Sequence, residues 1–387
     1  MFIMKQPLSL VVVAAGLFIM NANPTNASAL RHLSKDSLDS RDAEAEVRLH
    51  SKTDLDSFAP DEAKNSIGTT YDSIISMIKP DLLGAVTPNS VSIFGCARAE
   101  DNDELESIIT AAEPGGEVRL CPGKVEFNNE IELTKSITIT CAGPKFSCIF
   151  DGNGLTRHFK SESDSDLAFS GIAFINGQTL EGSGGSVKLS SSNKSTVSEY
   201  TILFDRCLFF NNRAYGSAIV GGALFVFGGK TVVNNCVFLE NVAKSKGSSY
   251  GGGGAIYAVY CDLSVLDSTF KKGSALQVNP SAIAAGGGAI TMVSSPFCAN
   301  GSCNLLVVGS VFELNEASTK GGAVFIKQVR SGTGEATLKV GWINNNALLF
   351  DNTAGETCDG VFVTNIVEGI GGTTTTKCVS VGDNFSV

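Results

Sequence analysis

The stretch that decides the fold is CVFLENVAKSKGSSYGGGGAI, which runs from Cys236 to Ile256. It holds two short motifs: Phe-x-x-Asn at Phe238 and Asn241, and Gly-Gly-Ala followed by an aliphatic residue, which ends at Ile256. Both motifs recur along the chain and alternate strictly. Repetition at a spacing of tens of residues is the signature of a solenoid, in which each repeat forms one turn of a stack.

The copies of the two motifs define the repeat. The first stands at Phe209/Asn212, Phe238/Asn241 and Phe312/Asn315, with degenerate copies at Phe174/Gly177, Phe270/Gly273 and Leu349/Asn352. The second stands at Gly221–Leu224, Gly253–Ile256, Gly287–Ile290 and Gly321–Val324, with weaker forms at Gly184–Val187 and Asp359–Val361. Neighbouring copies of the first motif are 29 residues apart at the closest (209 to 238) and 42 at the widest (270 to 312). Six ordered alternations predict an all-β, right-handed parallel β-helix.

Stacking explains which residue type each position needs. Each strand of a parallel β-helix pairs with the same strand of the next turn, about 4.8 Å away, so like residues stack on like. We expect a buried column of Phe, an Asn side chain bonded to backbone groups at a bend, and glycines where a side chain would not fit. The residues two before each Phe are small and share its inward parity: Cys207, Cys236, Ser268 and Ser310.

The segments before the repeats differ in composition. Residues 1–29 have the pattern of a secretory signal peptide, with Lys5, a short apolar stretch and a small-residue cleavage site at Ala27–Ala29. The apolar stretch is too short to span a bilayer, so no membrane span is expected. Residues 30–90 are interpreted as disordered or as a removable pro-segment. Within them, an apolar stretch is typical of a short helix that ends near Pro80; its apolar residues are Ile74, Ile75, Met77, Ile78, Leu82 and Leu83.

Residues 91–387 are expected to form the β-helix domain. A helical pattern from Asp101 predicts a short capping helix over Glu104–Ala112, because a solenoid needs a cover at its end. Strands are predicted at Glu117–Leu120 and Ile131–Thr140.

Eleven cysteines behind a signal peptide predict disulfides and a secreted, extracellular or cell-surface protein. The expected pairs are Cys141 with Cys148, Cys298 with Cys303, Cys358 with Cys378, and Cys96 with Cys121. Cys207 and Cys236, on adjacent turns, form either a further disulfide or two buried thiols. The glycosylation candidates, each in an Asn-x-Ser sequon, are Asn193, Asn300 and Asn384.

Composition excludes several classes of function. With 29 basic and 39 acidic residues the net charge is −10, and the chain has no basic run, so nucleic acid is not an expected partner. Only three histidines occur and no cysteine spacing resembles a zinc site, so neither a metal nor another cofactor is expected. His158 is expected to be an exposed strand residue.

The search for catalytic residues leaves a single compact cluster. Asp205 and Arg206 are adjacent, with Arg213 after the next turn. A polysaccharide lyase needs a base near carboxylates, and a glycoside hydrolase needs two carboxylates facing one bond. The other interpretation of the cluster is a solvated turn. Asp151–Gly154 looks like a cation-binding loop but has no trailing Glu, so a plain turn is predicted.

A binding face is the other possibility. Alternation along the strands sends the residue after each inward aliphatic residue outward, which gives Phe225, Tyr257, Thr291 and Phe325 on successive turns. Exposed aromatic rings in a line suit stacking on sugars or contact with a protein. Inserted loops such as Lys244–Tyr250, or the N-terminal segment, would instead cover them.

The paired motifs resemble the repeats of the polymorphic outer-membrane protein family over roughly Phe169–Val363. Residues Asp101–Phe159 are similar to the opening of pectin-lyase-like β-helices. The first resemblance implies a non-catalytic β-helix that serves in adhesion, with a polysaccharide or a cell-surface protein as its partner. The second implies the alternative of a divergent polysaccharide lyase or glycoside hydrolase.

Overall fold

The computed structural model describes most of the chain after residue 94. The described residues are 95–191, 200–216, 221–245, 251–277, 285–294, 302–330, 337–343, 348–350, 352–354, 361–367, 376–379 and 385–386. The chain divides into two units, Met1–Phe58 and Ala59–Val387, and all described residues lie in the second. The expected signal peptide, the whole of the expected pro-segment and the three sequon asparagines lie outside them.

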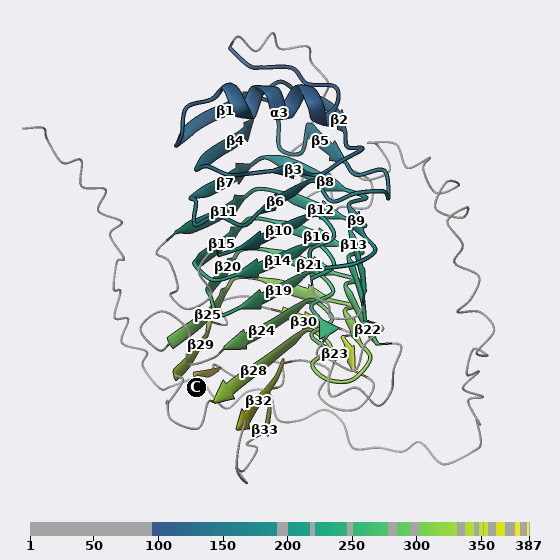
Figure 1. Cartoon of the computed structure of the whole chain (residues 1–387). Coiled ribbons are helices and arrows are strands. Elements are labelled where there is room, and N and C mark those ends of the chain that lie inside the picture. Colours follow the sequence, from purple (N-terminus) through teal and green to yellow (C-terminus); the bar gives the residue numbers. More distant parts are fainter. Residues whose placement is uncertain are drawn as a thin grey trace, which may run out of the picture. The chain divides into compact units, whose positions relative to one another are not determined.

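The described residues form a right-handed parallel β-helix, as the repeats predict (Figure 1). Four sheets run along the stack, and the chain visits them in the order A, B, D, C on most turns. Sheet A is β1 (Gly116–Leu120), β4 (Ile137–Cys141), β7 (Leu167–Ser170), β11 (Thr201–Asp205), β15 (Lys230–Asn234), β20 (Asp262–Leu266), β25 (Ser302–Val308), β29 (Thr337–Ile343) and β34 (Phe385–Ser386). Sheet B is β2 (Gly123–Glu126), β5 (Cys148–Asp151), β8 (Ile172–Ile175), β12 (Leu208–Phe210), β16 (Val237–Leu239), β21 (Thr269–Lys271), β26 (Val311–Glu313) and β30 (Leu348–Phe350).

Sheets C and D complete each turn. Sheet C is β3 (Ile131–Glu132), β6 (Phe159–Ser161), β10 (Val187–Ser190), β14 (Leu224–Phe227), β19 (Ile256–Val259), β24 (Ile290–Ser294), β28 (Val324–Arg330), β32 (Val361–Val367) and β33 (Thr376–Val379). Sheet D is β9 (Gln178–Thr179), β13 (Arg213–Gly216), β17 (Val242–Ser245), β22 (Ser274–Gln277), β27 (Glu316–Ala317) and β31 (Thr353–Ala354). A small fifth sheet pairs β18 (Gly251–Gly252) with β23 (Ala285–Gly286). Pairing between the named strands is parallel except where β33 and β34 turn back on β32 and β29.

The first turn is capped by helix α3 (Asn102–Ala111), which confirms the predicted cap with its start two residues earlier. Asp101 is the N-cap, and its Oδ1 accepts a hydrogen bond from the Glu104 backbone N–H at 2.9 Å. Leu105 and Ile109 are buried against the core. The predicted strand Ile131–Thr140 is wrong as one element, because the chain bends from sheet C to sheet A between β3 and β4.

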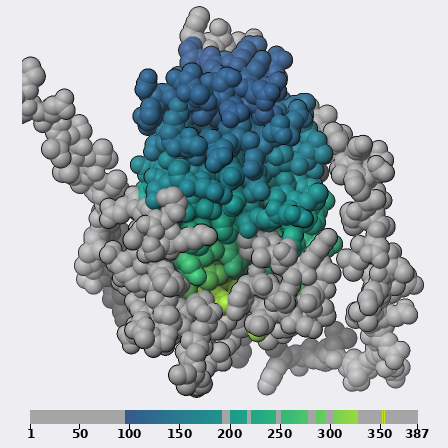
Figure 2. Space-filling view, viewed as in Figure 1, coloured from purple at the N-terminus to yellow at the C-terminus, as the bar shows by residue number. Residues whose placement is uncertain are grey.

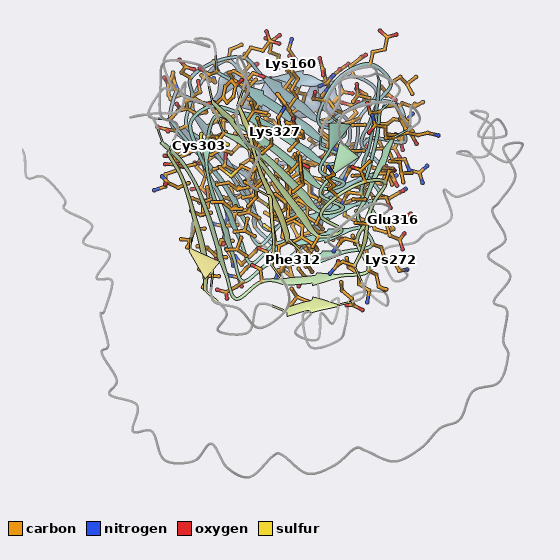
Figure 3. The ribbon with its side chains drawn as sticks, turned by 90° about the horizontal axis from the view of Figure 1, so that it is seen from below. Lys160, Lys272, Cys303, Phe312, Glu316 and Lys327 are labelled. Atoms are coloured by element: carbon orange, nitrogen blue, oxygen red, sulfur yellow. A yellow bond between two sulfur atoms is a disulfide. The ribbon has the colours of Figure 1, made fainter. Side chains whose placement is uncertain are left out.

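The predicted phenylalanine column is confirmed. Ring centroids of successive members lie 4.6 to 4.8 Å apart and their planes are within 7° of parallel, from Phe174 through Phe209, Phe238 and Phe270 to Phe312. All five are at most 1% exposed. Leu349 pairs with Phe312 through the backbone register, and its side chain lies outside the described part. Figure 3 looks along the stack, with Phe312 labelled.

The asparagine of the first motif ties turns together, also as predicted. Asn241 Oδ1 accepts from both the backbone N–H and the Nδ2 of Asn212 at 3.0 Å, and Asn241 Nδ2 donates to the Phe209 carbonyl at 2.9 Å. Asn315 and Asn352 repeat this arrangement. Each amide therefore satisfies backbone groups that the bend leaves unpaired.

The glycines of the second motif have two roles. The first of each pair has a positive φ, between 65° and 72° at Gly221, Gly253, Gly287 and Gly321. The second lies so close to the next turn that a Cβ on Gly222 would collide with the Gly254 carbonyl oxygen. Glycine at both places is therefore required by geometry.

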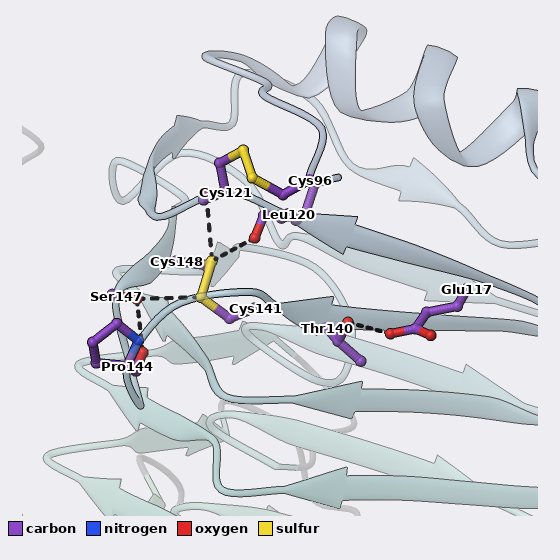
Figure 4. The surroundings of a disulfide bond; sticks show 9 residues. All are labelled: Cys96, Glu117, Leu120, Cys121, Thr140, Cys141, Pro144, Ser147 and Cys148. Carbon is purple, nitrogen blue, oxygen red and sulfur yellow. Dashed lines mark hydrogen bonds between the residues drawn. A yellow bond between two sulfur atoms is a disulfide. The ribbon is translucent and has the colours of Figure 1, made fainter. Parts of the chain in front are cut away.

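Two disulfides fasten the first turns (Figure 4): Cys96–Cys121 and Cys141–Cys148, both as predicted. Cys303 is also disulfide-bonded. Its expected partner Cys298, as well as Cys358 and the side chain of Cys378, lies outside the described residues.

Cys207 and Cys236 are buried free thiols, so the second of the two interpretations holds. They stack with Ser268 and Ser310, and each side chain accepts the backbone N–H of the residue on the preceding turn: Cys207 N–H to Cys236 Sγ at 3.4 Å and Cys236 N–H to Ser268 Oγ at 3.1 Å. The small inward column is therefore a hydrogen-bonding column.

Candidate functional site

The catalytic candidate Asp205 lies at the bend from β11 to β12 and is held by its neighbours. Its Oδ2 accepts from Arg206 Nε at 2.8 Å and from Ser170 Oγ at 3.2 Å, while Oδ1 accepts from Asn234 Nδ2 at 2.8 Å. Arg206 has a positive φ of 52° because it forms the bend itself. Both carboxylate oxygens are thus occupied within a turn.

Arg213 does not join this cluster. It lies past the other end of β12, where its guanidinium donates to Asn211 Oδ1 at 3.0 Å. Within the described residues, no hydrogen bond or ion pair links Arg213 to Asp205 or Arg206. Strand β12 separates the two bends, so the sequence proximity of Arg206 and Arg213 does not produce one site.

Sequence reasoning missed Lys145, which the loop between β4 and β5 carries toward Asp205 and Arg206. Burial lowers the pKa of Lys145, the positive charge of Arg206 lowers it further, and Asp205 raises it. The cluster holds one carboxylate, whereas sugar hydrolysis by the usual mechanism needs two facing carboxyl groups. No sequence signal could reveal Lys145, because it belongs to an earlier turn and to no repeat motif.

His158 is not an exposed strand residue, as was expected, but fully buried at a bend. Its Nδ1 lies 3.0 Å from Ser186 Oγ, and its ring meets those of Phe127 and Phe174 edge to face. Burial lowers its pKa to about 4, although Asp151 raises it. Because it is enclosed among phenylalanines, His158 has no access to a substrate.

Asp151, the start of the suspected cation loop, belongs to a plain turn. Its Oδ1 accepts from the Asn153 backbone N–H at 2.9 Å, and its Oδ2 lies 2.9 Å from Lys124 Nζ. Within the described ranges, no group of three or more His, Cys, Asp or Glu side chains is placed to hold a metal ion. The same residues include no helix that is both long and apolar enough to cross a bilayer.

The predicted aromatic line on sheet C exists, but most of it is covered. The register places Phe225, Tyr257, Thr291 and Phe325 side by side on the outer face. Tyr257 is 6% and Phe325 3% exposed, whereas Phe225 is half-buried. An accessible stripe of three rings is therefore not present.

The fifth sheet lies over this part of sheet C. Thr291 Oγ1 donates to the Gly286 carbonyl of β23 at 2.6 Å, and a Cβ on Gly286 would collide with the Phe325 ring. The connections from sheet D to sheet C therefore bring β18 and β23 back across the outward aromatics, which is the covering by loops that the sequence left open.

The accessible part of the same face lies on the earlier turns. Lys160 of β6, Lys188 of β10 and Phe225 of β14 occupy one register column, so they follow one another along the stack. Lys188 Nζ lies 3.2 Å and Lys160 Nζ 3.7 Å from Glu162 Oε1. Hydrogen bonding to Lys188 lowers the pKa of Glu162. We call Lys160, Lys188 and Phe225 the sheet C column.

A family model described as the Chlamydia polymorphic membrane protein repeat matches residues 235–259. That segment contains β16, β17, β18 and β19, which is one full alternation of the two motifs. No curated protein matches the chain. The chain therefore carries a repeat similar to that of the chlamydial polymorphic membrane proteins, built into a parallel β-helix.

Proposed function

We propose that this protein is a secreted or cell-surface β-helix that mediates adhesion by binding a polysaccharide or a surface protein without cleaving it. The observation that carries the proposal is the sheet C column, where two amino groups and an aromatic ring lie in line on an accessible face. The match to a polymorphic membrane protein repeat supports it. The bonded state of Asp205 favours binding over catalysis.

The dimensions of the sheet C column suit a short stretch of an acidic glycan. Lys160 and Phe225 are two turns apart, about 10 Å at the usual strand spacing. Ammonium groups pair with sugar carboxylates or sulfates, and a phenylalanine ring stacks on the apolar face of a sugar. Glu162 pairs with both lysines, and Lys160 Nζ also lies 4.0 Å from Glu132 Oε2. Both carboxylates are exposed, so an acidic ligand can replace them.

The disulfides support the proposed location. Cys96–Cys121 and Cys141–Cys148 form in oxidising surroundings, and such bonds are rare in the reducing cytosol. Among the described residues, the free thiols of Cys207 and Cys261 are enclosed: burial raises the pKa of Cys261 to about 12 and that of Cys207 well above its usual value. They therefore stay protonated and unreactive at neutral pH.

The test is a panel of acidic and neutral polysaccharides, scored for both retention and cleavage by the purified chain. We expect retention of acidic members without cleavage. Lys188→Ala and Phe225→Ala should each weaken retention about tenfold or more, as loss of a charge-assisted or stacking contact does. Lys271→Ala, a lysine also paired with a carboxylate but on sheet B, is the matched control and should bind normally.

Cleavage would replace this proposal by the enzymatic alternative. If products form and Asp205→Asn or Arg206→Ala eliminates them, the cluster at the β11–β12 bend is catalytic. If binding persists in both Lys188→Ala and Phe225→Ala, the sheet C column is not the binding face.

A further inference from the structure

The outer face of sheet B carries an apolar patch that the motifs do not explain. Its members point away from the phenylalanine column, and the register puts them in two adjacent lines on three consecutive strands, β8, β12 and β16. The first line is Ala173, Leu208 and Val237, and the second is Ile175, Phe210 and Leu239. We call these six residues the sheet B patch.

Charged pairs flank the sheet B patch on both sides, and on the earlier side Ile149 of β5, in the line of Ala173, is partly buried and also packs against it. On the earlier side, Lys124 pairs with Asp151 at 2.9 Å, at the same outward register positions of β2 and β5. On the later side, Lys271 of β21 pairs with Glu313 of β26 at 2.8 Å. A sheet face exposed to water normally carries charged and polar residues, as these flanking turns do. The apolar patch is a local exception to this composition.

The patch is outward-facing and yet shielded from water. Its six members are between 1% and 6% exposed. Phe146, from the loop between β4 and β5, also belongs to the cluster, and it is itself only 2% exposed. Phe146 lies at the outside of the stack, so the cover extends beyond it.

Apart from the β4–β5 loop that carries Phe146, the connections next to the strands of the patch offer little further cover. They are short and described, such as Arg206 and Cys207 before β12 and Asn211 and Asn212 after it. The undescribed loops between turns, 192–199, 217–220, 246–250, 278–284 and 295–301, join sheet D to sheet C or sheet C to sheet A. None of these loops begins or ends at a strand of sheet B.

The segment that precedes Gly95 begins next to sheet B. Cys96 is bonded to Cys121, which stands two residues before β2. At its other end the described chain finishes with β33 on sheet C and β34 on sheet A. The N-terminal side of the chain is thus the one attached beside sheet B.

We propose that the segment Tyr71–Leu83 of the same chain docks on the sheet B patch. Tyr71, Ile74, Ile75 and Ile78 recur at intervals of three and four residues, which is the spacing of one apolar face of a helix. Pro80 ends the pattern, and Leu82 and Leu83 follow it. An apolar helix face of this length matches a patch three strands wide.

The tether is long enough for this docking. The residues between Leu83 and Cys96 can span about 40 Å when extended. The patch is centred on β12, three strands along from β2, or about 14 Å at the usual strand spacing. The docked segment would make part of residues 30–90 an outer layer of the β-helix, and its removal would uncover an apolar surface. This inference does not rest on the proposed function.

Photo-crosslinking in the full mature chain tests the docking directly. Phe210 is replaced by the photoreactive analogue p-benzoylphenylalanine, and the tryptic products are sequenced by mass spectrometry after reduction. We expect attachment within Tyr71–Leu83 of the same molecule. The same analogue at Lys271, in the same line of sheet B but beyond the patch, should give no such product. Mixing light and isotopically heavy protein distinguishes attachment within one chain from attachment to a second copy.

A second measurement does not depend on the analogue. Ile74→Ser, Ile75→Ser and Ile78→Ser together should raise the fluorescence of a dye that binds exposed apolar surface several-fold, with the far-UV circular dichroism unchanged. Leu33→Ser, Leu38→Ser and Leu49→Ser together are the matched control and should not raise it. Crosslinks to a second copy, to another segment or to nothing, or equal fluorescence of the two triple variants, would overturn the docking.

Discussion

On strands β8, β12 and β16 of sheet B both the inner and the outer face are apolar, but only the inner face follows the repeat. Inside, a phenylalanine stands on each strand from β8 to β26 in face-to-face contact. Outside, apolar residues occupy β8, β12 and β16 and give way to Lys271 and Glu313 on later strands. A side chain that recurs on every turn packs within the core of the stack. One that is confined to a few turns packs against an element that covers only those turns.

The largest expected effect lies on the inner face. Phe238→Ala should lower the free energy of unfolding by ~3–5 kcal/mol, because it removes one ring from the stacked column and leaves a cavity between Phe209 and Phe270. Urea unfolding followed by circular dichroism measures it. A loss below about 1 kcal/mol would mean that the column does not carry the stability of the stack.

Lowering the pH should destabilise the fold through the buried His158. The pKa of His158 is about 4 when folded, below the usual 6.5, so the unfolded chain takes up the proton first as pH falls. The free energy of unfolding should be unaffected above pH 6.5 and should decrease toward pH 4 by up to about 3 kcal/mol. Comparison with His158→Gln at pH 7 and pH 4.5 isolates this term, since the variant should lack it.

On the outer face, Leu208→Ala distinguishes a covered patch from a bare one. Leu208 is 1% exposed, so truncating it should lower the free energy of unfolding by ~2–4 kcal/mol, because a cavity forms beneath the cover. The same change on an exposed strand costs well under 1 kcal/mol. In the background of the triple serine variant at Ile74, Ile75 and Ile78 the cost should shrink, and a double-mutant cycle measures the difference.

The smallest effect is expected at the bend between β11 and β12. Asp205→Asn keeps two of the bend's hydrogen bonds and removes a partly exposed ion pair. The free energy of unfolding should therefore change by less than about 1 kcal/mol. Lys145 would then lose the nearby negative charge, and its pKa should fall further. Titration of Lys145 by NMR checks the direction.

Much of the fold was predictable because the repeat states each inward position several times. The inward columns of Phe, of Asn and of Cys or Ser could be assigned from the sequence, because each position recurs and stacked positions favour similar residues. His158 could not, because it stands in one turn only and no copy shows its inward direction. The covering of Tyr257 and Phe325 depends on how β18 and β23 fold back, and short-range pattern does not record this.

The candidate site was harder for the same reason. Asp205 and Arg206 are neighbours in the sequence, and the sequence suggested both a site and a turn. Whether Asp205 belongs to a site or to a turn depends on its hydrogen bonds to Ser170, on the preceding turn of the β-helix, and to Asn234, on the following one. Such partners are far apart along the chain, so only the register between turns identifies them.

The asparagine column has glycine at two positions: Gly177 at its start, and Gly273 in its interior, where no side chain can accept from the preceding turn. Asn212 and Asn241 form one linked pair, and Asn315 and Asn352 another. A force applied along the stack loads the bonds between neighbouring turns. The step from Asn241 to Gly273 keeps its strand pairing and its stacked rings but lacks the amide clasp of its neighbours, so this corner should be among the first to separate under such a force.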